Sequence, residues 1–157
     1  VGTDATVSNT SYSKCCWFNL DDVTTFQPLI CGTNSMRHCM WMNKTANLTA
    51  SHSNTSAFSS PTFTSIAGTT TLSTGIWYFG AVTYSNSTGW KLYLNGVEDG
   101  TSANTTTFTG NQEIVIGAYS SGNNFTGRIT NVLVYNRVVS ATEIMQNYNA
   151  TKGRFGL

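Results

Sequence analysis

Carboxylates are the first residues to consider for chemistry, because glycoside hydrolysis uses two of them, one on each side of the scissile bond. The sequence holds seven acids: Asp4, Asp21, Asp22, Glu98, Asp99, Glu113 and Glu143. No two stand two or four residues apart within an expected strand, the spacing that would place both on one face. Asp21-Asp22 and Glu98-Asp99 fall in expected turns, and Glu143 is accounted for by helix capping. The sequence therefore predicts no hydrolase and no catalytic residue.

Histidine and cysteine give no catalytic or metal pattern either. The sequence has His38 and His52, and Cys15, Cys16, Cys31 and Cys39. No Cys-x-x-Cys spacing for zinc is present, and neighbours such as His38 and Cys39 point to opposite faces of a strand. The same argument separates Cys15 from Cys16. Cys31 and Cys39 either close a hairpin as a disulfide or remain buried thiols.

Binding through surface loops is the chemistry that remains. Sugar sites pair an aromatic ring, which stacks on C–H faces, with amides and hydroxyls that take the sugar hydroxyls. The loop from Tyr119 to Asn124 has this composition, and Tyr119, Asn123 and Asn124 are its candidates. Asn86 and Trp90, near another turn, are further candidates. Trp90 also alternates in phase with two leucines, which favours a core position for it.

Charge is scarce in this chain of 157 residues. Only 15 residues are Asp, Glu, Lys or Arg, and the net charge is +1. That balance argues against nucleic-acid binding, which depends on clustered Lys and Arg, and no apolar run is long enough to span a membrane. The 26 Thr, 17 Ser and 16 Asn must solvate the surface, while 19 aromatic residues supply a core. This composition predicts an all-β protein.

Short alternating segments separated by polar turns indicate the strands. They are expected at Tyr12–Leu20, Phe26–Cys31, His38–Asn43, Ile76–Ser85, Trp90–Leu94, Glu113–Ile116 and Gly127–Tyr135. Asn95-Gly96 predicts a tight hairpin turn, and residues 43–75 predict short edge strands and loops. Strands at this spacing indicate a sandwich or barrel.

One short helix is expected near the end of the chain. Ser140 and Glu143 have the spacing of a capping box, and they begin a helix over about 141–149. Residues 152–157 are interpreted as a terminal extension of a single domain, 1–157. Phe155 in this tail is expected to pack either on the domain or against a neighbouring chain.

A set of segments, in this order, resembles the laminin-G-like branch of the concanavalin A-like lectin/glucanase jelly rolls. They are 77–84 (WYFGAVTY), 92–96 (LYLNG), 114–117 (IVIG), 125–129 (FTGRI), 134–140 (VYNRVVS) and the helix at Glu143. The resemblance implies a jelly-roll β-sandwich of two antiparallel sheets with one short C-terminal helix. Family members often carry an acid where this chain has Thr130 and Asn131. Since Ca²⁺ prefers carboxylate oxygens, no cofactor is expected, and calcium is doubtful.

The C-terminal segment 147–157 resembles the ends of tailed-phage virion proteins that carry this domain. It implies a non-catalytic structural or adhesion module: a capsid decoration, head fibre or tail-associated protein at a virion surface. Phe155 and Leu157 would anchor it to other virion proteins or to a second copy, and surface loops could bind cell-surface glycans.

The alternative is an extracellular carbohydrate-binding lectin domain of a secreted cellular protein, with its sequons glycosylated. Eight Asn-x-Ser/Thr sequons are present, at Asn9, Asn43, Asn47, Asn54, Asn86, Asn104, Asn124 and Asn149.

Overall fold

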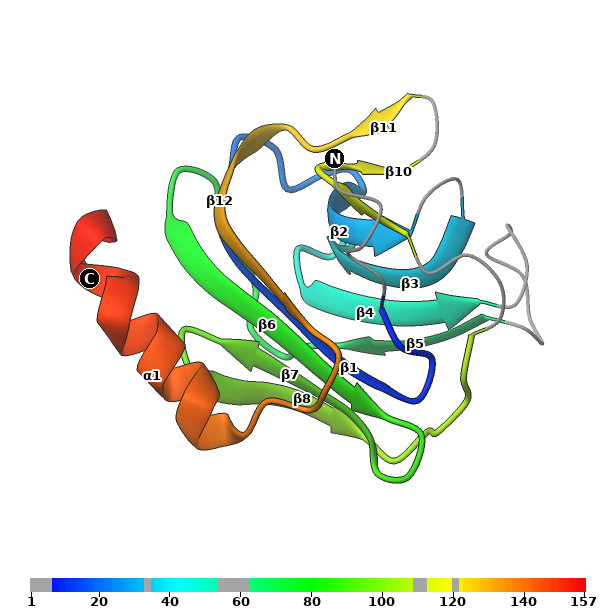
Figure 1. The fold of residues 1–157 in the computed structure, drawn as a ribbon. Coiled ribbons are helices and arrows are strands. Elements are labelled where there is room, and N and C mark those ends of the chain that lie inside the picture. Colours follow the sequence, from blue (N-terminus) through cyan, green and yellow to red (C-terminus); the bar gives the residue numbers. More distant parts are fainter. Residues whose placement is uncertain (1–6, 33–34, 54–62, 109–112, 120–121) are drawn as a thin grey trace.

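A computed structural model describes residues 7–32, 35–53, 63–108, 113–119 and 122–157, and shows two antiparallel sheets packed face to face (Figure 1). The first sheet has the order β12-β1-β6-β7-β8. Its strands are β1 (Ser11–Leu20), β6 (Trp77–Ser85), β7 (Gly89–Leu94), β8 (Val97–Ser102) and β12 (Gly127–Tyr135). The second sheet has the order β5-β4-β3-β2-β9. Its strands are β2 (Gln27–Gly32), β3 (Ser35–Met42), β4 (Leu48–Ser53), β5 (Phe63–Ala67) and β9 (Ile114–Ile116).

Two smaller elements complete the described chain. A hairpin of β10 (Ala118–Tyr119) and β11 (Asn123–Asn124) lies beside β2 at one end of the sandwich (Figure 1). Helix α1 (Ala141–Thr151) and a 3-10 turn, η1 (Lys152–Phe155), follow the last strand. The predicted all-β jelly-roll sandwich with one C-terminal helix is confirmed. None of the helices in the described ranges is long and apolar enough to cross a membrane.

Alternation along β1 distributes its side chains between two layers. Cys16 and Phe18 enter the core between the sheets, whereas Cys15 and Trp17 enter a second cluster on the outer face of the first sheet. The opposite orientation predicted for the adjacent cysteines is therefore confirmed. All four thiols are buried and none forms a disulfide, so the reduced alternative holds for Cys31 and Cys39.

The C-terminal helix covers that outer cluster (Figure 1). Its start is a complete capping box: Ser140 accepts the Glu143 amide, and Glu143 accepts the Ser140 amide. The predicted terminal extension then turns back onto the domain. Residues 152–155 form η1, and the Phe155 ring stacks on Trp17 at 4.1 Å between centroids. Of the two placements expected for Phe155, the structure shows the one on the domain.

The Glu98-Asp99 pair corrects a second expectation, because both residues lie in β8 and not in a turn. The predicted hairpin at Asn95-Gly96 is confirmed, and it places Val97 opposite Leu94. Glu98 then pairs with Lys91 at 2.7 Å across the strands. One Asp99 oxygen accepts three bonds from Thr69 and Thr70, so this carboxylate fastens the loop after β5 to β8.

An unusual polar group lies within the core. The Lys14 ammonium is completely buried and donates to the carbonyls of Ile30 and His38 and to His38 Nδ1, at 2.7–3.1 Å. Beside it, Tyr12 donates its hydroxyl to His52 Nε2 at 2.8 Å, and His52 Nδ1 donates to the Thr106 carbonyl at 2.9 Å. A carbonyl only accepts, which fixes this tautomer of His52. These bonds satisfy polar groups that would otherwise be costly to bury.

Candidate aromatic binding hollow

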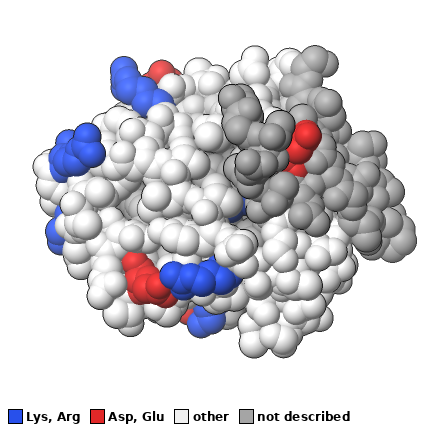
Figure 2. Space-filling view, in the orientation of Figure 1, with Lys and Arg blue, Asp and Glu red and all other residues white. Residues whose placement is uncertain are grey.

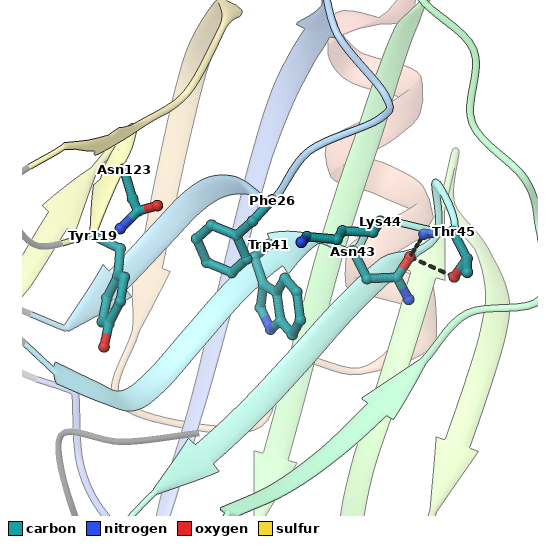
Figure 3. A pocket seen from close by; sticks show the side chains of 7 residues that line it. All are labelled: Phe26, Trp41, Asn43, Lys44, Thr45, Tyr119 and Asn123. Carbon is teal, nitrogen blue, oxygen red and sulfur yellow. Dashed lines mark hydrogen bonds between the residues drawn. The ribbon is translucent and has the colours of Figure 1, made fainter. Parts of the chain in front are cut away.

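A hollow of about 540 Å³ lies on the outer face of the second sheet, beside the β10–β11 hairpin. Its walls combine three aromatic side chains with amides, a hydroxyl and one ammonium. The lining residues are Phe26, Trp41, Asn43, Lys44, Thr45, Tyr119 and Asn123. Figure 3 shows Tyr119 and Asn123 on one side of Phe26 and Trp41, with the Asn43–Thr45 turn on the other. Its volume is in the range of small-molecule sites.

Trp41 reaches this face because β3 alternates. Met40 and Met42 point into the core between the sheets, so Trp41 and Cys39 point outward. The Trp41 indole donates to Ser51 Oγ on the neighbouring strand at 3.2 Å, which holds one edge of the ring. Its centroid is 4.6 Å from that of Phe26. The two rings therefore form one continuous apolar wall.

A buried amide positions Phe26. Gln27, 1% exposed, donates to the Asp22 carboxylate and the Thr25 hydroxyl, and accepts the Thr126 amide at 2.7 Å. The hydroxyls of Thr24 and Thr25 also donate to Asp22. These bonds lower the pKa of Asp22 to about 2, chiefly through Thr25. One side chain thus joins the loop before β2 to the loop after β11.

Tyr119 and Asn123 face each other across the β10–β11 hairpin. The hairpin is closed by the Phe125 amide, which donates to the Gly117 carbonyl, and is fastened to β2 by Gly117, which donates to Leu29. Gly117 has φ +69°, a conformation that favours glycine. The Tyr119 ring meets Phe26 edge to face at 5.9 Å. Burial, with smaller effects from Cys39 and Cys31, raises the pKa of Tyr119, so its hydroxyl keeps its proton.

The third wall is the turn between β3 and β4. Asn43 Oδ1 accepts the amides of Thr45 and Asn47 and the Thr45 hydroxyl, at 2.8–3.0 Å (Figure 3). The Asn47 side chain also donates to the Thr70 carbonyl. This turn fixes the backbone that carries Lys44, whose side chain is exposed and extends toward Phe26 and Trp41.

A second hollow of about 410 Å³ adjoins the first. Phe26, Lys44 and Asn123 line both, so the two hollows share a boundary. The second adds mainly polar groups: Thr25, Gly122, Asn124 and Thr126. One side of the pair is therefore apolar and ring-lined, and the other is rich in hydroxyls and amides.

Three of the predicted binding residues are brought together here. Tyr119 and Asn123 line the first hollow, and Asn123 and Asn124 line the second. The other two are not part of this site. Asn86 is exposed in the turn between β6 and β7, at the opposite end of the sandwich (Figure 1). Trp90 is 2% exposed and packs edge to face on Tyr84 and His52, so the binding role expected for it is wrong.

Sequence analysis missed Phe26, Trp41 and the turn carrying Lys44. The expected strands Phe26–Cys31 and His38–Asn43 contain Phe26 and Trp41 without indicating a binding role for either. A signal was present for Trp41, because it is out of phase with Met40 and Met42 and directly precedes a polar turn.

Of the expected anchoring residues, Phe155 is half-buried in the chain's own outer cluster, and Leu157 is 48% exposed.

Among the residues that the structure describes, neither a metal cluster nor an acidic side chain lines the hollows. Within the described ranges, no three His, Cys, Asp or Glu side chains gather as metal ligands. The doubtful calcium position carries Asn131 in the left-handed region, φ 49°, at a bulge opposite β1. Asp22, the carboxylate bonded to the lining residue Thr25, accepts hydrogen bonds from three side chains, those of Thr24, Thr25 and Gln27, and from the Thr24 backbone amide. The described lining therefore combines aromatic rings with amides, hydroxyls and one ammonium, a composition that suits binding.

Comparison with solved structures finds many chains of the same architecture. A Bacteroides ovatus protein provisionally assigned to carbohydrate binding has 18% identity and TM-score 0.70 over 87% of this chain and 40% of its own. Domain 4 of AbnA, a GH43 extracellular arabinanase from Geobacillus stearothermophilus, was solved with arabinotriose. It has 23% identity and TM-score 0.67 over 89% of this chain and 66% of its own. The ligand-binding domain of botulinum neurotoxin serotype D, solved with N-acetylneuraminic acid, has 15% identity and TM-score 0.67, covering 96% and 38%.

These identities show a shared fold, which resembles that of carbohydrate-binding domains. The chain spans two fifths of the first of these proteins and about two thirds of the second. No curated protein matches the sequence. The sequence profile of the concanavalin A-like lectin/glucanases superfamily matches residues 1–145. With that match across both sheets, the chain belongs to the concanavalin A-like lectin/glucanases superfamily.

Proposed function

We propose that the chain is a non-catalytic glycan-binding module that holds an oligosaccharide in the paired hollows. The observation that carries the proposal is the apolar wall of Phe26, Trp41 and Tyr119 beside amides and hydroxyls. Sugar rings present C–H faces to aromatic rings and hydroxyls to polar groups, so both halves of the site have a partner. The carbohydrate ligands of the structural neighbours support this choice of ligand class.

Trp41→Ala tests this proposal. The variant removes the largest part of the wall, and we expect affinity for a glycan selected from an oligosaccharide array to fall at least about tenfold. Trp77→Ala is the matched control, since Trp77 is also half-buried but lies on the outer face of the other sheet. Calorimetric titration of both variants, after thermal melts confirm folding, gives the answer. If Trp41→Ala and Trp77→Ala bound the glycan with equal affinity, the hollow would not be the glycan-binding site.

The display of this module on a virion is the second part of the proposal. It rests on the resemblance of residues 147–157 to phage virion C-termini, and on the exposed Leu157 side chain beside the inward-packed Phe155. Of the two expected anchors, Leu157 is thus the one that a neighbouring subunit could reach. A secreted cellular lectin with occupied sequons remains the competing candidate.

Glycosylation separates the two candidates, because two sequons fall in the site. Asn43 lines the first hollow and Asn124 the second, so N-glycans attached there would fill the space meant for a ligand. The sequon at Asn54 lies outside the described residues. We expect native material to carry no mass of attached N-glycans and to sediment with large particles. A small species whose mass is raised by glycans would identify a secreted protein instead.

A further inference from the structure

We propose that the paired hollows select an acidic oligosaccharide, one whose carboxylate is held by Lys44 where the two hollows meet. This inference rests on the proposed function and adds the class of glycan. The aromatic wall alone does not determine whether the glycan is neutral or acidic. That choice follows from where charged groups lie around the site.

Lys44 is the one charged residue among the described lining of either hollow. Elsewhere on the surface, Lys91 is paired with Glu98 and Arg137 with Glu143. Lys44 has no acidic partner among the described residues, and its chain extends over the aromatic wall (Figure 3). An exposed ammonium without an acidic partner gains from a charge-assisted bond to an anionic ligand that binds beside it.

Hydrogen bonds within the turn that carries Lys44 fix the position from which its charged side chain extends. Besides the Asn43 side-chain bonds, the backbones of Asn43 and Asn47 are joined at 3.0 Å, and Ala46 donates to Asn43 at 2.9 Å. The Lys44 backbone is therefore fixed before a ligand arrives, and only the side chain must be ordered. Most of the visible molecular surface carries no charge (Figure 2), so an ionic contact here would be distinctive.

A negative charge behind one lining residue of the second hollow orients the ligand within the paired hollows. Thr25 and Thr126 line that hollow, and they are bonded to Asp22 and to the Asp21 amide. The Asp22 carboxylate stays ionised because Thr25, Thr24 and Gln27 hold its pKa at about 2. A ligand carboxylate is repelled there and attracted to Lys44. Neutral sugar hydroxyls therefore occupy the second hollow, and the acidic sugar lies over the rings.

The experiment uses pairs of oligosaccharides that differ only at the carboxyl group: hexuronic acid oligomers and their carboxyl-reduced neutral forms. At low salt we expect the acidic member to bind about tenfold more tightly, and the difference to shrink at 0.5 M salt. Lys44→Gln should lower affinity for the acidic member far more than affinity for the neutral member, so that the preference for the acid is lost. Lys44→Arg should keep the preference. Arg154→Gln, which makes the same change in net charge at an exposed C-terminal position, should change nothing.

Each outcome decides between the two proposals. If both members bind equally, or Lys44→Gln leaves the preference intact, while Trp41→Ala still removes binding, the acidic selectivity is wrong and the glycan-binding function stands. If Trp41→Ala has no effect, or no oligosaccharide binds, the proposed function fails and this inference with it. A sulfated neutral oligomer that binds through Lys44 more tightly than the uronic acid would overturn the carboxylate assignment.

Discussion

Lys14 places a positive charge between two sheets whose other contacts are largely apolar. Burial at this position favours the neutral amine over the charged ammonium. Burial lowers its pKa from 10.5 to about 8, although the Cys39 and Cys31 sulfurs oppose this shift. The groups around it, Tyr12 and Cys31, have raised pKa values because they too are buried. Tyr12 and Cys31 keep their protons at the pH where Lys14 loses its own, so neither of them supplies a buried anion to pair with it.

This environment predicts how Lys14 links stability to pH. Between pH 8 and 10.5 the folded state releases the Lys14 proton while the unfolded state keeps it, so the free energy of unfolding rises with pH over this interval. We expect the difference between wild type and Lys14→Met to move by about 3 kcal/mol in favour of wild type. Urea denaturation of both proteins at pH 7.5, 9 and 10.5 measures it. Subtracting the unfolding free energy of the variant from that of wild type removes the cysteine and tyrosine titrations that both proteins share. If the two free energies changed with pH in parallel, the lowered pKa of Lys14 would be wrong.

At the scale of elements, the C-terminal helix and η1 act as a cover for the outer face of the first sheet. Trp17 is completely buried there, because Phe155 stacks on it, Tyr148 lies 5.7 Å away, and its indole donates to Thr151. Phe155 also contacts Trp77 at 4.7 Å. A single turn after the helix therefore covers two tryptophans.

Phe155→Ala should loosen this cover without affecting the binding site. Since the ring is half-buried, we expect the free energy of unfolding to fall by about 2 kcal/mol, less than for a fully buried phenylalanine. Leu157→Ala, two residues on and exposed, should change it by less than about 0.5 kcal/mol. Chemical denaturation followed by tryptophan fluorescence measures both. Equal effects of the two substitutions would show that the Trp17 stack adds little.

The sequence predicted the elements better than it predicted their assembly into a site. Alternation placed Cys15 and Cys16 correctly, and the Asn95-Gly96 turn gave the right hairpin. The expected turn at Glu98-Asp99 is wrong, because residues 98–100 have poor strand propensity and still form part of β8. Pairing with β7 holds them in the sheet. The composition of the 119–124 loop indicated one wall of the hollow. The wall of Phe26 and Trp41 forms where β2 pairs with β3, with Pro28 opposite Trp41. The pairing of β2 with β9, far along the chain, then brings the Tyr119 hairpin beside this wall, and no local pattern reveals that pairing.

At the scale of the whole molecule, the first and last strands of the first sheet are neighbours. β1 lies between β6 and β12, with Trp17 opposite Phe79 on one side and Thr130 on the other. The second sheet, by contrast, is built largely from strands consecutive in the chain, β2 to β5, with β9 added at its edge. The sandwich therefore combines one mostly local sheet with one closed by distant segments, an arrangement that slows folding.

That strand order has a consequence during synthesis. A ribosome that has delivered the chain as far as β11 has released β1 with one of its hydrogen-bonding edges unpaired, and with Trp17 still lacking the helix that covers it. Unpaired edges invite pairing with other chains. Premature termination near residue 126 would therefore leave this edge of β1 open to association with other chains, whereas synthesis through β12 and α1 closes the edge and covers Trp17.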